Sequence, residues 1–161
     1  MTALVVIRFV AIFLTGLLAG IHFGDRMGAS FARPKLSPSG FVTFQQEQIA
    51  HFARMMPALS VVAILSSVTW LVLIWSQLGT AAVVFLALGT LAFILVAILT
   101  RSVNVPINKQ VMTWSAASPP SDVMEIWARW ERVHTIRTVL AVLGFACELI
   151  ALGLSKNGPA A

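Results

Sequence analysis

The sequence predicts an all-α integral-membrane protein, a four-helix bundle that forms a single transmembrane domain over residues 1–161. Its composition is 58% hydrophobic and only 11% charged, whereas soluble domains carry about 25% charged residues. Residues 55–100 contain no charged side chain and are interrupted once by turn-forming residues, at 76–80. Because a membrane-crossing helix needs roughly 20 apolar residues, this stretch fits a tight hairpin of two spans.

The first half of the chain predicts two helices joined by a loop. A first span covers residues 3–23, where Gly16, Ala19 and Gly20 would allow close helix contact. Residues 25–40 are rich in Gly, Ser and Pro and are expected to form a loop. A second helix covers 41–75 and crosses the membrane at about 57–76, with a kink expected at Pro57. A cleaved signal peptide is the alternative for the first span, but no Lys or Arg precedes Arg8.

The second half predicts two further spans. The third helix covers about 81–103, and Pro106 is suited to begin a short helix after it. Ser121 or Asp122 can cap the last helix, which crosses the membrane at about 135–154 and ends by Gly158. The second and fourth helices therefore extend beyond the bilayer on the side of the two longer loops.

Basic residues predict the orientation. Nine of the eleven Lys and Arg residues lie on the side of the two long loops, and only Arg8 and Lys156 lie on the side of the termini. The positive-inside rule places the loops in the cytoplasm and the termini outside, and we expect a bacterial plasma membrane. The net charge of +5 is not gathered into a basic cluster with a stacking platform, so a nucleic-acid partner is excluded.

Two helix faces next to the long loops carry ionisable and aromatic residues. Steps of three and four residues along the fourth helix place Trp127, Trp130, His134 and Arg137 on one face. The same steps on the second helix select Phe44, Glu47, His51 and Arg54. We expect these two faces to form one pocket at the membrane surface. The repeated His-x-x-Arg suggests a duplicated two-helix unit.

The residue types in this pocket favour proton chemistry on a flat, hydrophobic molecule. Histidine moves protons near neutral pH, so His134 or His51 is the expected base. Arg137 can stabilise an oxyanion and Trp130 can stack on an aromatic substrate, and Asn104 and Asn108 flank Pro106 near the same space. The alternative is that Trp and Arg simply lie at a bilayer interface, where both are common.

A metal site is a second hypothesis for the same region. Glu131-x-x-His134 has the spacing found in carboxylate-bridged sites of helical bundles, and the further candidate ligands are His22, Asp25, Glu47 and His51. A haem held by two histidines is also conceivable, although no attachment motif is present. Deeper in the membrane, Arg8 and Glu148 are expected to pair, because buried charges there seek partners.

The chain resembles the anthrone oxygenase-like family of small four-span membrane proteins. Two motifs carry the resemblance, Arg101-Ser-Val-Asn104-Val-Pro106-Ile-Asn108-Lys and Trp127-x-x-Trp130-x-x-x-His134-x-x-Arg137. The resemblance implies oxidation of anthrones to quinones by O2 without a classical cofactor. It also implies that His134 or His51 deprotonates a phenol, that Arg137 holds the oxyanion, and that Asn104, Asn108 and Trp130 position the substrate.

We therefore predict a monooxygenase-type oxidoreductase that takes an anthrone-, phenol- or quinol-like molecule from the lipid phase. No cofactor is expected beyond O2, with a metal or haem as the alternative. A non-enzymatic accessory subunit, or a protein that binds a lipid, pigment or haem, is the second class, and a homo-oligomer or a larger complex is compatible with either. A transporter is disfavoured because few polar residues lie in the middle of the spans.

Overall fold

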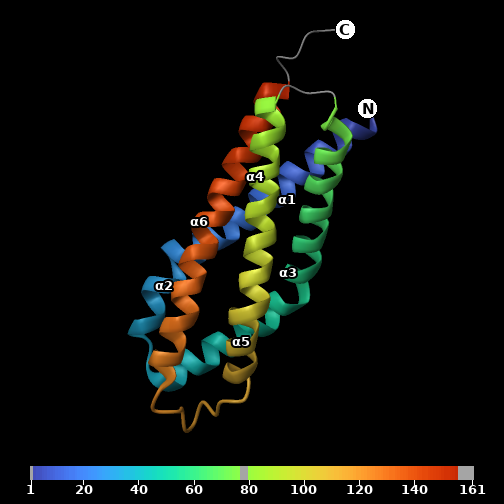
Figure 1. Ribbon diagram of the computed structural model, residues 1–161. Helices are drawn as coiled ribbons and strands as arrows, with labels where there is room; N and C mark the ends of the chain where they lie inside the picture. The colour runs from blue at the N-terminus through green and yellow to red at the C-terminus, as the bar shows by residue number, and fades with distance from the viewer. Residues whose placement is uncertain (1, 77–79, 156–161) are drawn as a thin grey trace.

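The computed structural model describes residues 2–76 and 80–155 and is an all-helical bundle (Figure 1). Four long segments run along it, and α1 packs on α3 and α6 while α4 packs mainly on α6. The elements in order are α1 (Ala3–Met27), α2 (Ala29–Ala32), η1 (Arg33–Lys35), α3 (Pro38–Ile74), α4 (Thr80–Leu99), the π-helical turn η2 (Thr100–Asn104), α5 (Val105–Val111) and α6 (Val123–Ser155).

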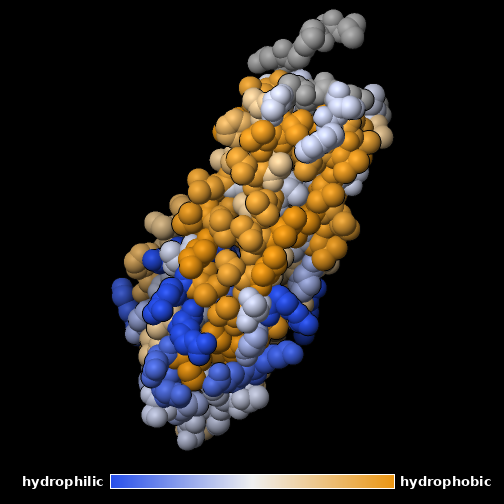
Figure 2. Space-filling view, in the orientation of Figure 1, coloured by the Kyte–Doolittle hydropathy of each residue, from blue (hydrophilic) through white to orange (hydrophobic). Residues whose placement is uncertain are grey.

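Both chain ends lie at one end of the bundle, which we call the terminal end, and the two long connections lie at the other, the loop end (Figure 1). All four long segments are apolar and long enough to cross a membrane. Hydrophobic side chains cover the body of the molecule and hydrophilic ones gather toward the loop end (Figure 2). The predicted four-span bundle is therefore confirmed. The predicted turn at 76–80 and the end of the last helix at Gly158 fall partly or wholly outside the described residues.

The predicted loop at residues 25–40 is wrong for most of its length. Helix α1 continues to Met27, and α2 and η1 follow at once. Gly28 does not break the chain direction, because its φ of −111° and ψ of −79° lie near the right-handed helical region. Hydrogen bonds tie the segment to α6, where Glu131 accepts from Ser30 Oγ at 2.9 Å and from Arg33 Nη1 at 2.9 Å. Tertiary contacts thus order a stretch whose composition suggests a loop.

Two prolines shape the helices around the loop end. Pro57 lies inside α3, which runs across the base of the bundle and then turns along it (Figure 1). Pro106 lies in the first turn of α5, as predicted, directly after the π-helical turn. A proline cannot donate to the fourth preceding carbonyl and its ring crowds that group, so a widened turn relieves the conflict. The third span therefore continues into α5 with a local change of pitch.

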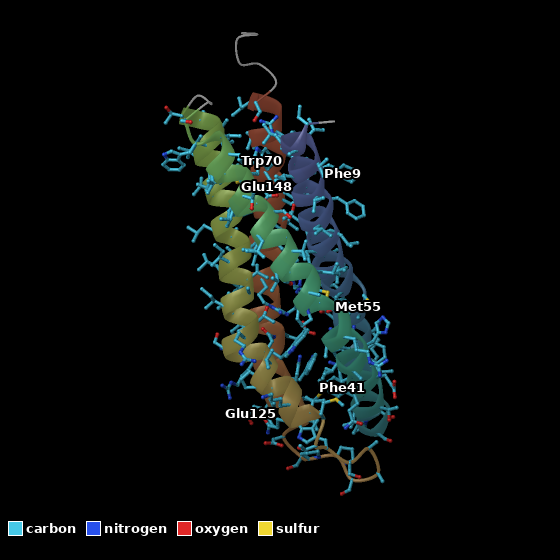
Figure 3. All side chains as sticks on the ribbon, turned by 90° about the vertical axis from the view of Figure 1, so that its right-hand side faces the viewer. Phe9, Phe41, Met55, Trp70, Glu125 and Glu148 are labelled. Atoms are coloured by element: carbon cyan, nitrogen blue, oxygen red, sulfur yellow. The ribbon has the colours of Figure 1, made fainter. Side chains whose placement is uncertain are left out.

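The predicted contact between Arg8 and Glu148 is wrong. Glu148 is fully buried and its oxygens contact Thr15 Oγ1 at 2.8 Å and Ser67 Oγ at 2.7 Å. Thr15 lies seven residues farther along α1 than Arg8, about 10 Å deeper at 1.5 Å per residue. The Arg8 guanidinium instead lies 5.7 Å from the centre of the Trp70 ring. Figure 3 shows both Trp70 and Glu148 in the terminal half of the bundle.

Helices α4 and α6 approach most closely where two glycines face each other. A Cβ atom on Gly89 would lie 2.8 Å from the carbonyl oxygen of Gly144 and equally close to Cγ of Glu148. On α1, Gly16 lies against the Phe145 ring and Ala19 is buried, as their size predicts, whereas Gly20 is exposed with open space around it. Small residues therefore mark close packing at some predicted positions and not at others.

Candidate functional site

A cavity of about 730 Å³ lies toward the loop end, between α1, α3, α4 and α6 and beneath η2 and α5. Its membrane-facing part is apolar, lined by Leu18, Ile64, Phe93 and Val96. Its other part is lined by polar side chains from α1, α3, η2, α5 and α6. A volume of this size accommodates a drug-sized or tricyclic molecule.

His134 and Arg137 lie side by side in the polar part, one turn apart on α6 and both nearly fully buried. Arg137 Nη2 is 3.1 Å from His134 Nδ1, and Arg137 Nη1 donates to Thr100 Oγ1 at 2.8 Å. A guanidinium has no lone pair to offer, so Nδ1 of His134 must be the acceptor and the ring proton must reside on Nε2. The pair thus presents a basic nitrogen next to a fixed cation.

Trp130 forms a wall of the same space and is held by the two predicted asparagines. Its indole Nε1 donates to Asn108 Oδ1 at 2.8 Å, and Asn104 Nδ2 donates to its carbonyl at 3.3 Å. The Trp130 ring stacks on His134 with centroids 4.8 Å apart and on Trp127 at 4.3 Å. The π-helical turn supplies Thr100 and Asn104, a placement typical of such turns at functional sites. The predicted face of the fourth helix is therefore one buried surface.

The predicted face of the second helix points the other way. Phe44, Glu47, His51 and Arg54 are all exposed, and none of them lines the cavity. The cavity face of α3 is instead Gln45, Gln48, Phe52 and Met56. The two faces start one residue apart, and one residue rotates a helix surface by about 100°. The structure thus does not bring His51 and His134 into one site.

The six candidate metal ligands are also not all brought together. His22 is buried and its ring centre lies 5.7 Å from that of His134, but Glu47 and His51 are exposed. The Glu131 carboxylate already accepts hydrogen bonds from Ser30 and Arg33. Within residues 2–76 and 80–155, no three His, Cys, Asp or Glu side chains are placed to hold a metal ion. A bound metal or haem stays a prediction.

Sequence reasoning considered Asp25 only as a metal ligand and missed that it faces His134 from α1. Asp25 Oδ2 lies 3.1 Å from His134 Nε2. Arg33, only 1% exposed, pairs with Asp25 and with Glu131 and also donates to Gln45 Oε1 at 3.0 Å. The available signal was the isolated Asp25 three residues after His22, which the expected loop obscured.

Several buried polar atoms that face the cavity make no hydrogen bond to the described part of the protein, although two of them, Asp25 Oδ2 and His134 Nε2, lie 3.1 Å apart. Five buried atoms that face it have no hydrogen bond within the described residues. They are Asp25 Oδ2, Gln45 Nε2, Asn104 Oδ1, His134 Nε2 and Arg137 Nε. Buried polar groups are nearly always paired, so this cluster points to a ligand with its own donors and acceptors.

Comparison with known families agrees with this arrangement. The sequence model of the anthrone oxygenase family matches residues 48–147, more than half of the chain. The chain belongs to the anthrone oxygenase family. No curated protein and no solved structure matches it.

Membership of the anthrone oxygenase family indicates an oxygenase-type function and confirms the resemblance drawn from the two motifs. The matched range contains Asn104, Asn108, Trp130, His134 and Arg137. Asp25, which completes the polar part of the cavity, lies before the matched range. The anthrone oxygenase match therefore covers much of the site but not the α1 side.

Proposed function

We propose that this protein is a membrane-embedded oxygenase that oxidises an anthrone-, phenol- or quinol-like aromatic molecule with O2. The observation that carries the proposal is the cavity in which His134 and Arg137 lie next to a stack of tryptophan rings. Membership of the anthrone oxygenase family supports the same reaction class. The apolar part of the cavity suits the body of a hydrophobic substrate, and the polar part suits its oxygen.

The substrate oxygen is placed between Arg137 Nη2 and His134 Nδ1, which are 3.1 Å apart and separate to admit it. His134 Nδ1 takes the phenol proton, and Arg137 binds the oxyanion that remains. The ring of Trp130 lies against that of His134 and offers a flat surface for the substrate. Asn104 and Asn108 hold Trp130 in place.

The electron-rich anion then reacts with O2, which is the oxidant. A bond forms between the activated ring carbon and one oxygen atom, giving a hydroperoxide once a proton is added. Loss of water from the hydroperoxide leaves a carbonyl group. In total a CH₂ group and O2 become C=O and H2O, so one oxygen atom enters the product and the other leaves as water.

Substitution of His134 tests the proposal. In lipid nanodiscs with an anthrone as substrate, His134→Ala should lower the O2 uptake rate by about 10²–10⁴-fold, the usual contribution of a general base. His51→Ala is the matched control, because this histidine is exposed outside the cavity. Wild-type uptake by His134→Ala, or an equal loss in both variants, would contradict the assignment.

The loop end is proposed to face the cytoplasm, because nine of the eleven basic residues lie on that side of the spans. A second candidate role is packing against another membrane helix, within a homo-oligomer or a larger complex. Gly20 and Gly24 on α1 and Gly28 directly after it lie exposed at four-residue spacing, as in small-residue helix contacts. Native mass measurement in nanodiscs checks this, since a single copy without partners would argue against it.

A further inference from the structure

The side chain of Asp25 is 9% exposed, and one of its carboxylate oxygens makes no hydrogen bond to the described residues. Its Oδ1 accepts from Gln48 Nε2 at 2.9 Å and from the Arg33 guanidinium. Its Oδ2 has no hydrogen bond and lies 3.1 Å from His134 Nε2. One carboxylate oxygen is therefore anchored, and the other is left facing the imidazole.

The anchor of Asp25 is itself built into the protein. Arg33 is 1% exposed and contacts Asp25, Glu131 and Gln48, the last at 2.8 Å. Its guanidinium also lies 5.5 Å from the ring centres of Trp127 and Trp130. Breaking such a buried charge network by removing one partner is costly, because the other charge is left buried and unpaired. Arg33 therefore holds the Asp25 carboxylate in one place beside the cavity.

The two ring nitrogens of His134 thus face opposite charges. The Arg137 guanidinium at Nδ1 requires a lone pair there, and the Asp25 carboxylate at Nε2 favours a proton there. Both neighbours select the same tautomer. This is the tautomer that leaves Nδ1 able to accept a proton once a substrate oxygen displaces Arg137.

We propose that Asp25, anchored by Arg33, is a positioning residue for the oxygenation: it holds His134 with its proton on Nε2 and stabilises the imidazolium formed when Nδ1 accepts the substrate proton. A carboxylate behind a histidine base performs the same two tasks in hydrolytic triads. The proposal rests on the proposed function for its catalytic consequence. Its tautomer consequence holds independently of any reaction.

Asp25→Asn tests it in two ways. The substitution keeps the shape of the side chain but removes its charge, so kcat with an anthrone should fall by about 10²-fold or more, and Asp25→Glu should recover part of the loss. Glu125→Gln is the control, since Glu125 is an exposed carboxylate on α6 that lies outside the cavity. It should change kcat by no more than a few-fold.

The second measurement is the ¹⁵N NMR spectrum of the imidazoles in the full-length protein in nanodiscs. The chain has three histidines, so His134→Gln assigns the signals of His134 by difference. The wild type and Glu125→Gln should show a protonated Nε2 and an unprotonated Nδ1, and Asp25→Asn should show a mixture of both tautomers. An inactive Asp25→Asn protein with an unchanged His134 spectrum would overturn the proposal, because Asp25 would then be merely structural. A wild-type kcat in Asp25→Asn would also overturn it. If the wild type fails to oxidise any anthrone while the tautomer shift occurs, only the proposed function has failed.

Discussion

At the loop end of the bundle, five buried polar atoms face the cavity without protein partners, whereas at the terminal end both oxygens of the buried Glu148 carboxyl are occupied. Two further unpaired atoms, Arg8 Nε and Trp70 Nε1, lie at the terminal end, where the Arg8 guanidinium packs over the Trp70 ring. The packing differs as well, because the Gly89–Gly144 contact closes the space that the cavity occupies at the other end. A cluster of unfilled buried polar atoms around a cavity thus indicates a ligand site, whereas a buried carboxyl whose hydrogen bonds are filled marks a helix contact.

The largest effect at the loop end should come from substitution of Arg137, which lines the cavity. Arg137→Met removes the cation beside His134 Nδ1 and should lower kcat with an anthrone by about 10²–10³-fold, the usual loss for one oxyanion donor. Arg129→Met, an exposed arginine two turns earlier on α6 and outside the cavity, is the control and should retain the wild-type rate. Equal rates in Arg137→Met and wild type would remove the oxyanion role.

The smallest effects should come from Glu148. Glu148→Leu removes the acceptor of Ser67 and should lower the free energy of unfolding in detergent by about 1 kcal/mol, while kcat per folded molecule stays unchanged. In Glu148→Gln the amide retains a carbonyl for Ser67 and offers an N–H toward Thr15, so stability should stay within about 0.5 kcal/mol of wild type. A loss of turnover in folded Glu148→Gln would show that the terminal end also takes part in the chemistry.

The four spans could be predicted because length and apolarity alone determine them, and the α6 face because Trp, His and Arg recur there at helical spacing. The α3 face was missed because residues 44–48 read Phe-Gln-Gln-Glu-Gln, in which polar side chains point in several directions. Only packing decides that Gln45 is fully buried while the neighbouring Phe44 is exposed. The contacts of Asp25 and Arg33 with α6 were missed for a different reason. The role of each residue depends on a partner on α6 that lies about a hundred residues away in the sequence. This partner is His134 for Asp25 and Glu131 for Arg33.

The central claim is that the loop-end cavity receives the substrate, and filling that cavity tests it most directly. Ala97 lines the cavity with a side chain that has no polar atom, so Ala97→Phe adds a ring there without removing any polar group. Ala146→Phe, at an exposed position on α6 outside the cavity, is the matched control. We predict that kcat/KM for an anthrone falls by at least about tenfold in Ala97→Phe, since an overfilled site costs about 1–3 kcal/mol, and is unchanged in Ala146→Phe. Wild-type kcat/KM in a folded Ala97→Phe protein would contradict the account.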